Sequence, residues 1–189
     1  GALTAYLVMS LPQSVKVVAQ IEHQVVERGA FALTGFFRSM ALVAGEADFA
    51  AINALWADLD LAWAERMLSR SNGALPGLVV VSSHNGGDRY DYSIGITVDK
   101  VQPEEEGIFI PAATWAIFTS VGPLPEAMVD TWRRIFTDWF PHSGTQCAPG
   151  PTLELYDEGD TQDLSYRCFL WLPIERQTEA AEGEQEEGV

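Results

Sequence analysis

Residues 128–156 read MVDTWRRIFTDWFPHSGTQCAPGPTLELY and combine a helical pattern with a strand pattern. Apolar side chains recur there at spacings of three and four, which predicts an amphipathic helix. The apolar stripe consists of Met128, Trp132, Ile135, Phe136 and Trp139. Pro125 and Glu126 stand where a first helical turn favours them. Pro141 is expected to end the helix, because its ring is incompatible with a continuing helix.

The strand that follows, Thr152 to Tyr156, carries an acidic side chain in an unusual setting. Strand alternation places its two leucines on one face and Glu154 on the other, together with Thr152 and Tyr156. Two interpretations of Glu154 stay open. It is either a carboxylate on a solvated sheet face or paired with Arg167, or it lies at the floor of an aromatic cleft. In such a cleft it would attract a cationic ligand with little competition from water.

A second helical stripe lies upstream and is expected to end before Asn72 and Gly73. Its members are Phe49, Ile52, Trp56, Leu59, Trp63 and Met67. Strand-like segments surround both helices: Val15 to Gln24, Gly29 to Phe37, Leu78 to Ser83, Tyr90 to Val98, Ile108 to Val121, Thr152 to Tyr156, and Ser165 to Pro173. The order strand, helix, strand, strand therefore occurs twice, and one further strand precedes the first occurrence.

This repeated order predicts an α+β fold built from duplicated β-α-β-β units. We expect two antiparallel sheets side by side, with a helix on each and a central ligand cleft, since ligand sites favour such seams. The pseudo-repeats span about 15–101 and 108–176, and a linker near Gln102 to Gly107 separates them. Residues 1–14 would be an N-terminal extension. The alternative is that the repeat is accidental.

The composition narrows the class of partner. The 189 residues suit one domain or two small fused halves. The chain has 27 acidic and 11 basic side chains and a net charge of −16, which makes it a poor direct binder of nucleic acid. Residues 177–189 hold five glutamates and no base, so we expect a disordered acidic tail.

The compartment and the metal chemistry follow from what the sequence lacks. It has no apolar run of membrane-spanning length and no basic region of a signal peptide, so we expect a cytoplasmic protein without membrane contact. Cys147 and Cys168 match no metal-ligand spacing and are expected to be free, buried thiols. His23 and His84 are isolated, and no nucleophile elbow or glycine-rich phosphate loop is present. We therefore expect no metal and no cofactor.

Two of the quoted segments, 131–144 (TWRRIFTDWFPHSG) and 150–156 (GPTLELY), resemble the GyrI-like effector-binding domain. This domain occurs at the C-terminus of many AraC-type and some MerR-type transcription regulators, and as stand-alone proteins. Residues 116–123 (AIFTSVGP) and 171–174 (WLPI) resemble the same pattern. One departure is that Thr145 and Gln146 stand where the family usually has an aromatic residue and a glutamate, so a more open cleft rim is expected.

The resemblance implies a cleft that binds small, often cationic and aromatic molecules, with Glu154 in the place of the family's buried acid. We expect aromatic residues on strands near the seam to complete the site, because ring faces attract cations. The expected ligand-binding residues are Glu154, Tyr92, Trp115, Phe118, Tyr156 and Trp171. Each ring has a core-packing alternative. Trp56 and Trp132 are expected to be packing residues, although Trp56 could reach the cleft.

Three functions are compatible with these observations. The first is a small-molecule binding module, either stand-alone or the sensor part of a transcription regulator, with a homodimer among the open oligomeric states. The second is a GyrI-like hydrolase that opens strained rings, in which Glu154 and a phenol, Tyr92 or Tyr156, position water. The third, ranked lowest, is an acidic gyrase inhibitor that imitates DNA phosphates. A binding module is favoured over an enzyme.

Overall fold

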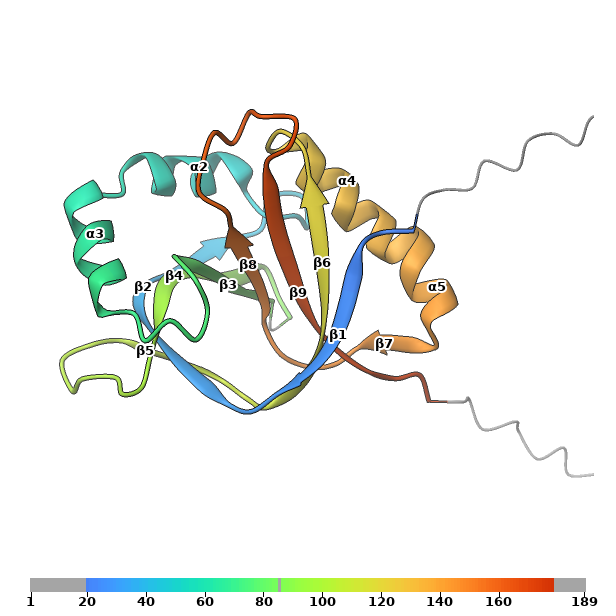
Figure 1. Cartoon of the computed structure of the whole chain (residues 1–189), viewed down its shortest axis with the longest axis horizontal. Coiled ribbons are helices and arrows are strands. Elements are labelled where there is room, and N and C mark those ends of the chain that lie inside the picture. The colour runs from blue at the N-terminus through green and yellow to red at the C-terminus, as the bar shows by residue number, and fades with distance from the viewer. Residues whose placement is uncertain (1–19, 85, 179–189) are drawn as a thin grey trace, which may run out of the picture.

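The computed structural model describes residues 20–84 and 86–178, which form a curled sheet with helices on one face (Figure 1). The elements are β1 (His23–Arg28), β2 (Phe31–Ala41), α2 (Phe49–Ala57), α3 (Leu61–Arg70), β3 (Val79–Ser83), β4 (Arg89–Val98), β5 (Gly107–Ile110), β6 (Ala113–Val121), α4 (Glu126–Arg134), the π-helix η1 (Ile135–Trp139), α5 (Phe140–Ser143), β7 (Thr145–Cys147), β8 (Thr152–Tyr156) and β9 (Arg167–Arg176). The expected extension 1–14 and nearly all of the expected tail lie outside the described residues.

All strand pairs are antiparallel, and the predicted α+β fold is confirmed. The strand order is β1-β6-β9-β8-β3-β4-β2-β5, and β7 pairs with β9. Two similar halves, β6-β9-β8 and β3-β4-β2, lie side by side. They meet where β8 pairs with β3, with Val80 opposite Glu154, so the two predicted sheets are continuous across the seam.

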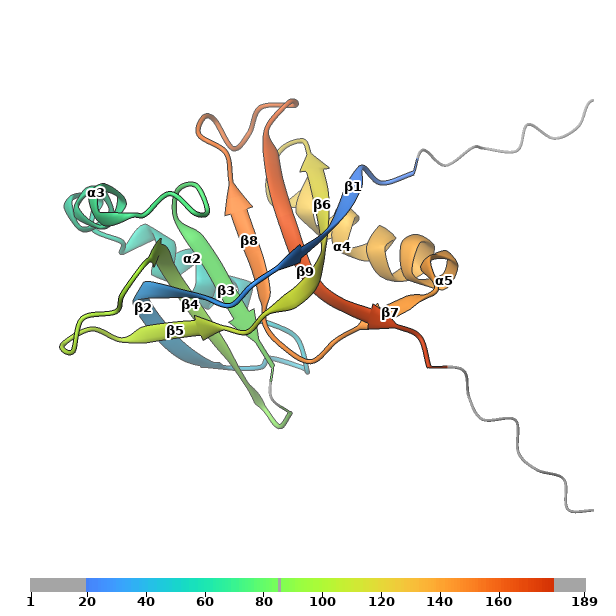
Figure 2. The ribbon, with the colours of Figure 1, turned by 60° about the horizontal axis from the view of Figure 1, so that its bottom comes forward.

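The two repeats exchange their leading strands. β1 precedes β2 in the chain but pairs with β6 of the other half, with His23 opposite Phe118. Conversely, β5 precedes β6 but pairs with β2, with Ile110 opposite Phe31. Figure 2 shows β1 and β5 as arms that cross between the halves. The exchange is the same in both directions, as expected for a duplicated unit. It joins the two halves into one sheet.

The core lies on both faces of the sheet. On the face away from the helices, strand side chains pack on one another, and on the helix face they pack under α4 and η1 or under α2. The non-helix cluster contains Leu33, Leu75, Val79, Val81, Ile110, Trp115, Ile117, Leu153, Leu155 and Trp171. Because alternate residues of a strand face opposite ways, Leu153 and Leu155 in this cluster place Glu154 on the helix face.

The helix predictions needed two corrections. The stripe predicted as one helix forms α2 and α3, because the Asp60 side chain caps a new helix by accepting a hydrogen bond from the Ala62 amide at 3.0 Å. Pro141 does not end the second helix. It lies in the first turn of α5, where a missing amide hydrogen is tolerated, and the helix ends at Gly144 in the left-handed conformation, φ 67°.

The strand predictions also shifted. The long strand predicted over 108–121 is divided into β5 and β6, because Pro111 and Ala112 lie between them. The first predicted strand, Val15 to Gln24, overlaps β1 only at His23 and Gln24, and residues 15–19 lie outside the described part. The stretch 102–107, predicted as a linker, forms the turn that leads into β5.

Candidate functional site

Glu154 lies at the seam between the two halves of the sheet. It is the central residue of β8, with Val80 of β3 on one side and Leu170 of β9 on the other. Both neighbours belong to clusters that pack under helices, Val80 under α2 and Leu170 under α4 and η1. Figure 1 shows α2 and α4 over the two halves, with β8 between them. The carboxylate is therefore half-buried on the helix face, near the pseudo-twofold axis.

Three aromatic side chains form a connected group with this carboxylate. The Tyr156 hydroxyl donates to Glu154 Oε2 at 2.5 Å. The Trp56 indole Nε1 on α2 donates to the Tyr92 hydroxyl at 2.8 Å. The Trp56 and Tyr156 rings pack edge to face with centroids 6.2 Å apart. We call Glu154, Tyr156, Tyr92 and Trp56 the seam cluster; it combines one carboxylate with three rings.

A methionine from the other helix touches the same cluster. The Tyr156 hydroxyl lies 4.0 Å from Met128 Sδ on α4. Trp56 and Met128 thus connect both helices, α2 and α4, to Tyr156. The methionine thioether is polarizable and flexible, and it packs against partners of varied shape.

The electrostatics of Glu154 are those of a charge without a partner. Burial raises the pKa of Glu154, and the hydrogen bond from Tyr156 lowers it by less. Among the described residues, the side-chain ion pairs are Arg70–Glu105 and Arg133–Asp130, and neither involves Glu154. The alternative pairing with Arg167 is not formed; that guanidinium lies 5.3 Å from the Phe169 ring centroid.

The two phenols of the cluster stay protonated. Burial, and after it the charge of Glu154, raises the pKa of Tyr156. The pKa of Tyr92 is raised chiefly by burial and less by Glu154, against a lowering by Trp56. A protonated phenol donates one hydrogen bond, and Tyr156 uses its proton to hold the Glu154 carboxylate in place.

Three of the six residues predicted for the site lie elsewhere. Trp115 and Trp171 are buried on the opposite face of the sheet, with ring centroids 5.9 Å apart, because Trp171 alternates with Leu170 along β9. Phe118 shares the helix face but is fully buried under η1, 4.9 Å from the Trp139 ring. The structure brings together Glu154, Tyr92 and Tyr156, and adds Trp56 and Met128. The helical stripes contained both additions, but they did not show which stripe members would face the seam.

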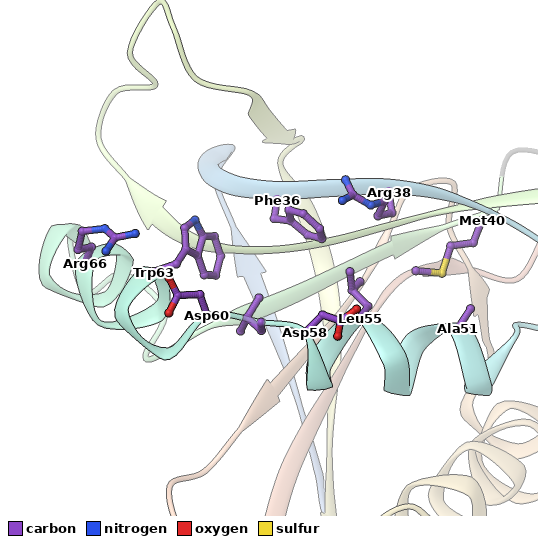
Figure 3. Close-up of a pocket in the computed structure, with 10 residues that line it drawn as sticks. Phe36, Arg38, Met40, Ala51, Leu55, Asp58, Asp60, Trp63 and Arg66 are labelled. Atoms are coloured by element: carbon purple, nitrogen blue, oxygen red, sulfur yellow. The ribbon is translucent and has the colours of Figure 1, made fainter.

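A cavity of about 540 Å³ lies to one side of this cluster, between β2 and the helices α2 and α3 (Figure 3). Its lining residues are Phe36, Arg38, Met40, Ala51, Leu55, Asp58, Leu59, Asp60, Trp63 and Arg66. None of them belongs to the seam cluster. We call this space the outer cavity.

The described residues bear on the expectations for metal ligands, cysteines and membrane-spanning helices. Over 20–84 and 86–178, no group of three or more His, Cys, Asp or Glu side chains could hold a metal ion. Both cysteines are free, as predicted, but Cys147 is exposed rather than buried. Burial raises the pKa of the Cys168 thiol to about 11. None of the described helices is both long and apolar enough to cross a membrane.

Comparisons with known proteins agree with this architecture. The family pattern described as "GyrI-like small molecule binding domain" matches residues 38–175. The solved structure of SAV2435 bound to tetraphenylphosphonium has a TM-score of 0.70 at 19% identity, covering 82% of this chain and 94% of that one. The comparison with curated protein sequences gives no match.

Two further solved structures share the fold. A putative bacterial transcription regulation protein from Staphylococcus aureus has a TM-score of 0.67 at 18% identity, with 82% of this chain and 99% of that chain covered. The C-terminal domain of EcmrR has a TM-score of 0.54 at 13% identity, with coverage of 83% and 99%. At these identities the likeness concerns the fold.

Proposed function

The chain belongs to the GyrI-like family of small-molecule-binding domains, and we propose that its seam cluster binds lipophilic organic cations with Glu154 as the counter-charge. The observation that carries this proposal is the half-buried Glu154 carboxylate, which has no basic partner among the described residues and is linked through Tyr156 to rings from α2 and β4. A buried charge is costly unless it is paired. A cationic ligand would supply the missing pair.

The neighbouring rings suit the same kind of ligand. The faces of Trp56, Tyr92 and Tyr156 can attract a cation by about 0.5 to 2 kcal/mol each, depending on desolvation. Burial of an apolar ligand body adds roughly 25 cal/mol per Å². Tetraphenylphosphonium, the ligand in the SAV2435 structure, has both properties: a positive charge and an apolar aromatic surface. We propose it as a probe for this chain.

The role of Glu154 is tested by charge selectivity. Isothermal titration calorimetry would compare tetraphenylphosphonium with triphenylphosphine oxide, a neutral molecule of related shape. At a separation of roughly 6 Å and an effective dielectric constant near 20, the attraction of Glu154 for the cation is about 3 kcal/mol. Because desolvation offsets part of this, we expect Glu154→Gln to weaken tetraphenylphosphonium binding about 10- to 100-fold and to leave the neutral compound within about twofold.

Glu158→Gln is the matched control, since Glu158 lies in the exposed turn after β8. It removes the same charge from the chain and should leave both affinities unchanged. Equal losses in the two variants would show that the cation responds only to overall charge, and no loss in Glu154→Gln would refute the proposed role. A binding role also requires that the ligand is recovered chemically intact. Cation binding at Glu154 is compatible with a stand-alone binding protein and with the sensor part of a transcription regulator.

A further inference from the structure

Helix α2 is an apolar helix that is incompletely buried. Its sequence, FAAINALWA, has Asn53 as its single polar residue, yet none of its residues is fully buried. Ile52, Leu55 and Trp56 pack against the β4 cluster and remain partly exposed. An apolar helix normally buries the whole of its inner face. Part of the apolar surface of α2 is therefore not packed against the sheet.

The outer cavity occupies the space that this arrangement leaves open. Figure 3 shows Phe36 and Met40 of β2 facing Leu55 and Ala51 of α2 across it, with Trp63 of α3 at one end. Its volume, about 540 Å³, lies within the range of roughly 300 to 1,000 Å³ typical of small-molecule sites. All of its apolar lining residues are partly exposed, so water covers apolar surface that a ligand could bury.

The charged residues of the outer cavity balance one another. Asp58, Asp60, Arg38 and Arg66 are all exposed and contribute two charges of each sign. Arg38 is already engaged, because its guanidinium lies 4.0 Å from the Phe36 ring centroid and donates to the Phe37 carbonyl oxygen. Asp60 accepts from the amide of Ala62. The rim therefore carries no net charge and the walls between are apolar.

We propose that the outer cavity is a second ligand site, which takes an uncharged, lipophilic aromatic molecule. A neutral rim favours neither a cation nor an anion. Burial of the half-exposed apolar walls from β2, α2 and α3 by a ligand would be favourable. The outer cavity differs in this respect from the seam cluster, where Glu154 stands alone. Helix α2 serves both places: Trp56 belongs to the seam cluster, and the adjacent Leu55 lines the outer cavity.

The test uses N-phenyl-1-naphthylamine, a neutral aromatic probe whose fluorescence rises in apolar surroundings, titrated into the full chain. Ala51→Trp places an indole inside the outer cavity, while Ala54→Trp places the same side chain on the exposed face of the same helix. We expect saturable binding to the parent chain. Ala51→Trp should weaken it at least tenfold, and Ala54→Trp should leave it within about twofold.

One more variant keeps the proposal open to refutation. If Ala51→Trp does not fold by circular dichroism, Leu55→Gln adds a polar group of similar size to the same wall and should weaken the probe severalfold. Absence of saturable binding to the parent chain would overturn the proposal. Equal affinity of Ala51→Trp and Ala54→Trp would do so as well, since the probe would then bind outside the outer cavity.

Discussion

Replacing Glu154 by glutamine is expected to stabilise the folded chain above about pH 5, although it removes the charge that attracts cations. Burial raises the pKa of Glu154 in the folded state from an ordinary value of 4.5. The unfolded chain therefore releases this proton at a lower pH than the folded chain does. The resulting stability is fully present below about pH 4.5 and is lost as the pH rises through the raised pKa.

The expected size follows from the two opposing contributions at Glu154. Leaving a buried polar group without a full set of partners costs about 1–3 kcal/mol. The hydrogen bond from Tyr156 offsets part of the burial cost, but burial is the larger effect. We therefore expect a net stabilisation at the lower end of this range, about 1 kcal/mol, in Glu154→Gln at pH 8. For a domain of this size, this is a rise in Tm of about 2–4 °C.

Differential scanning calorimetry at pH 8.0 and pH 4.0, without ligand, measures this effect. The Tm difference between Glu154→Gln and the parent chain should be positive at pH 8.0 and close to zero at pH 4.0, where the parent carboxyl is protonated in both states. Glu158→Gln, in an exposed turn, should follow the parent at both values. A Glu154→Gln protein that is less stable than its parent at pH 8.0 would refute the reasoning, since Glu154 would then be stabilised as an anion.

Three other changes have defined outcomes. In the parent chain, tetraphenylphosphonium affinity should rise as the pH rises through the raised pKa of Glu154. Calorimetry from pH 5 to pH 9 would show this rise; an affinity independent of pH would contradict the claim that ionised Glu154 attracts the cation. Tyr156→Phe removes the hydrogen bond that lowers the pKa of Glu154, so the rise should move to higher pH; an unshifted profile would mean that this bond does not hold the carboxylate. Gly35→Ala should cost about 3 kcal/mol in urea unfolding, at the upper end of the usual overpacking range, because its Cβ would lie 2.1 Å from the Ile94 carbonyl oxygen. Gly29→Ala, with open space around it, is the control, and equal stability of the two variants would refute the close approach.

The sequence predicted the duplicated order and the facing of Glu154 because both depend on local patterns. Strand alternation in β8 needs only neighbouring residues, and Leu153 and Leu155 do face the side opposite Glu154. The exchange of β1 and β5 between the halves was not predictable in this way. It depends on which distant strands pair, as in the pairing of β1 with β6.

The dependence on distant strand pairing also explains why only some of the predicted aromatic residues lie beside Glu154. Whether a ring on β9 shares a face with Glu154 is decided by the register that places Leu170 opposite Glu154 and therefore directs Trp171 the other way. A slip of one residue would exchange the two faces. Trp56 was undecided for a related reason, since the rotation of α2 about its axis determines which apolar side chains meet Tyr92 and Tyr156.

The most direct test of cation binding at the seam cluster is a crystal structure of the chain with tetraphenylarsonium, whose arsenic can be located by its anomalous scattering. We predict arsenic on the helix face of the sheet between α2 and α4, nearer to the Glu154 carboxylate than to any other carboxylate, with phenyl rings against Trp56 and Tyr156. Arsenic in the outer cavity, or beside the exposed acids of the turn after β8, would contradict the proposed role of Glu154.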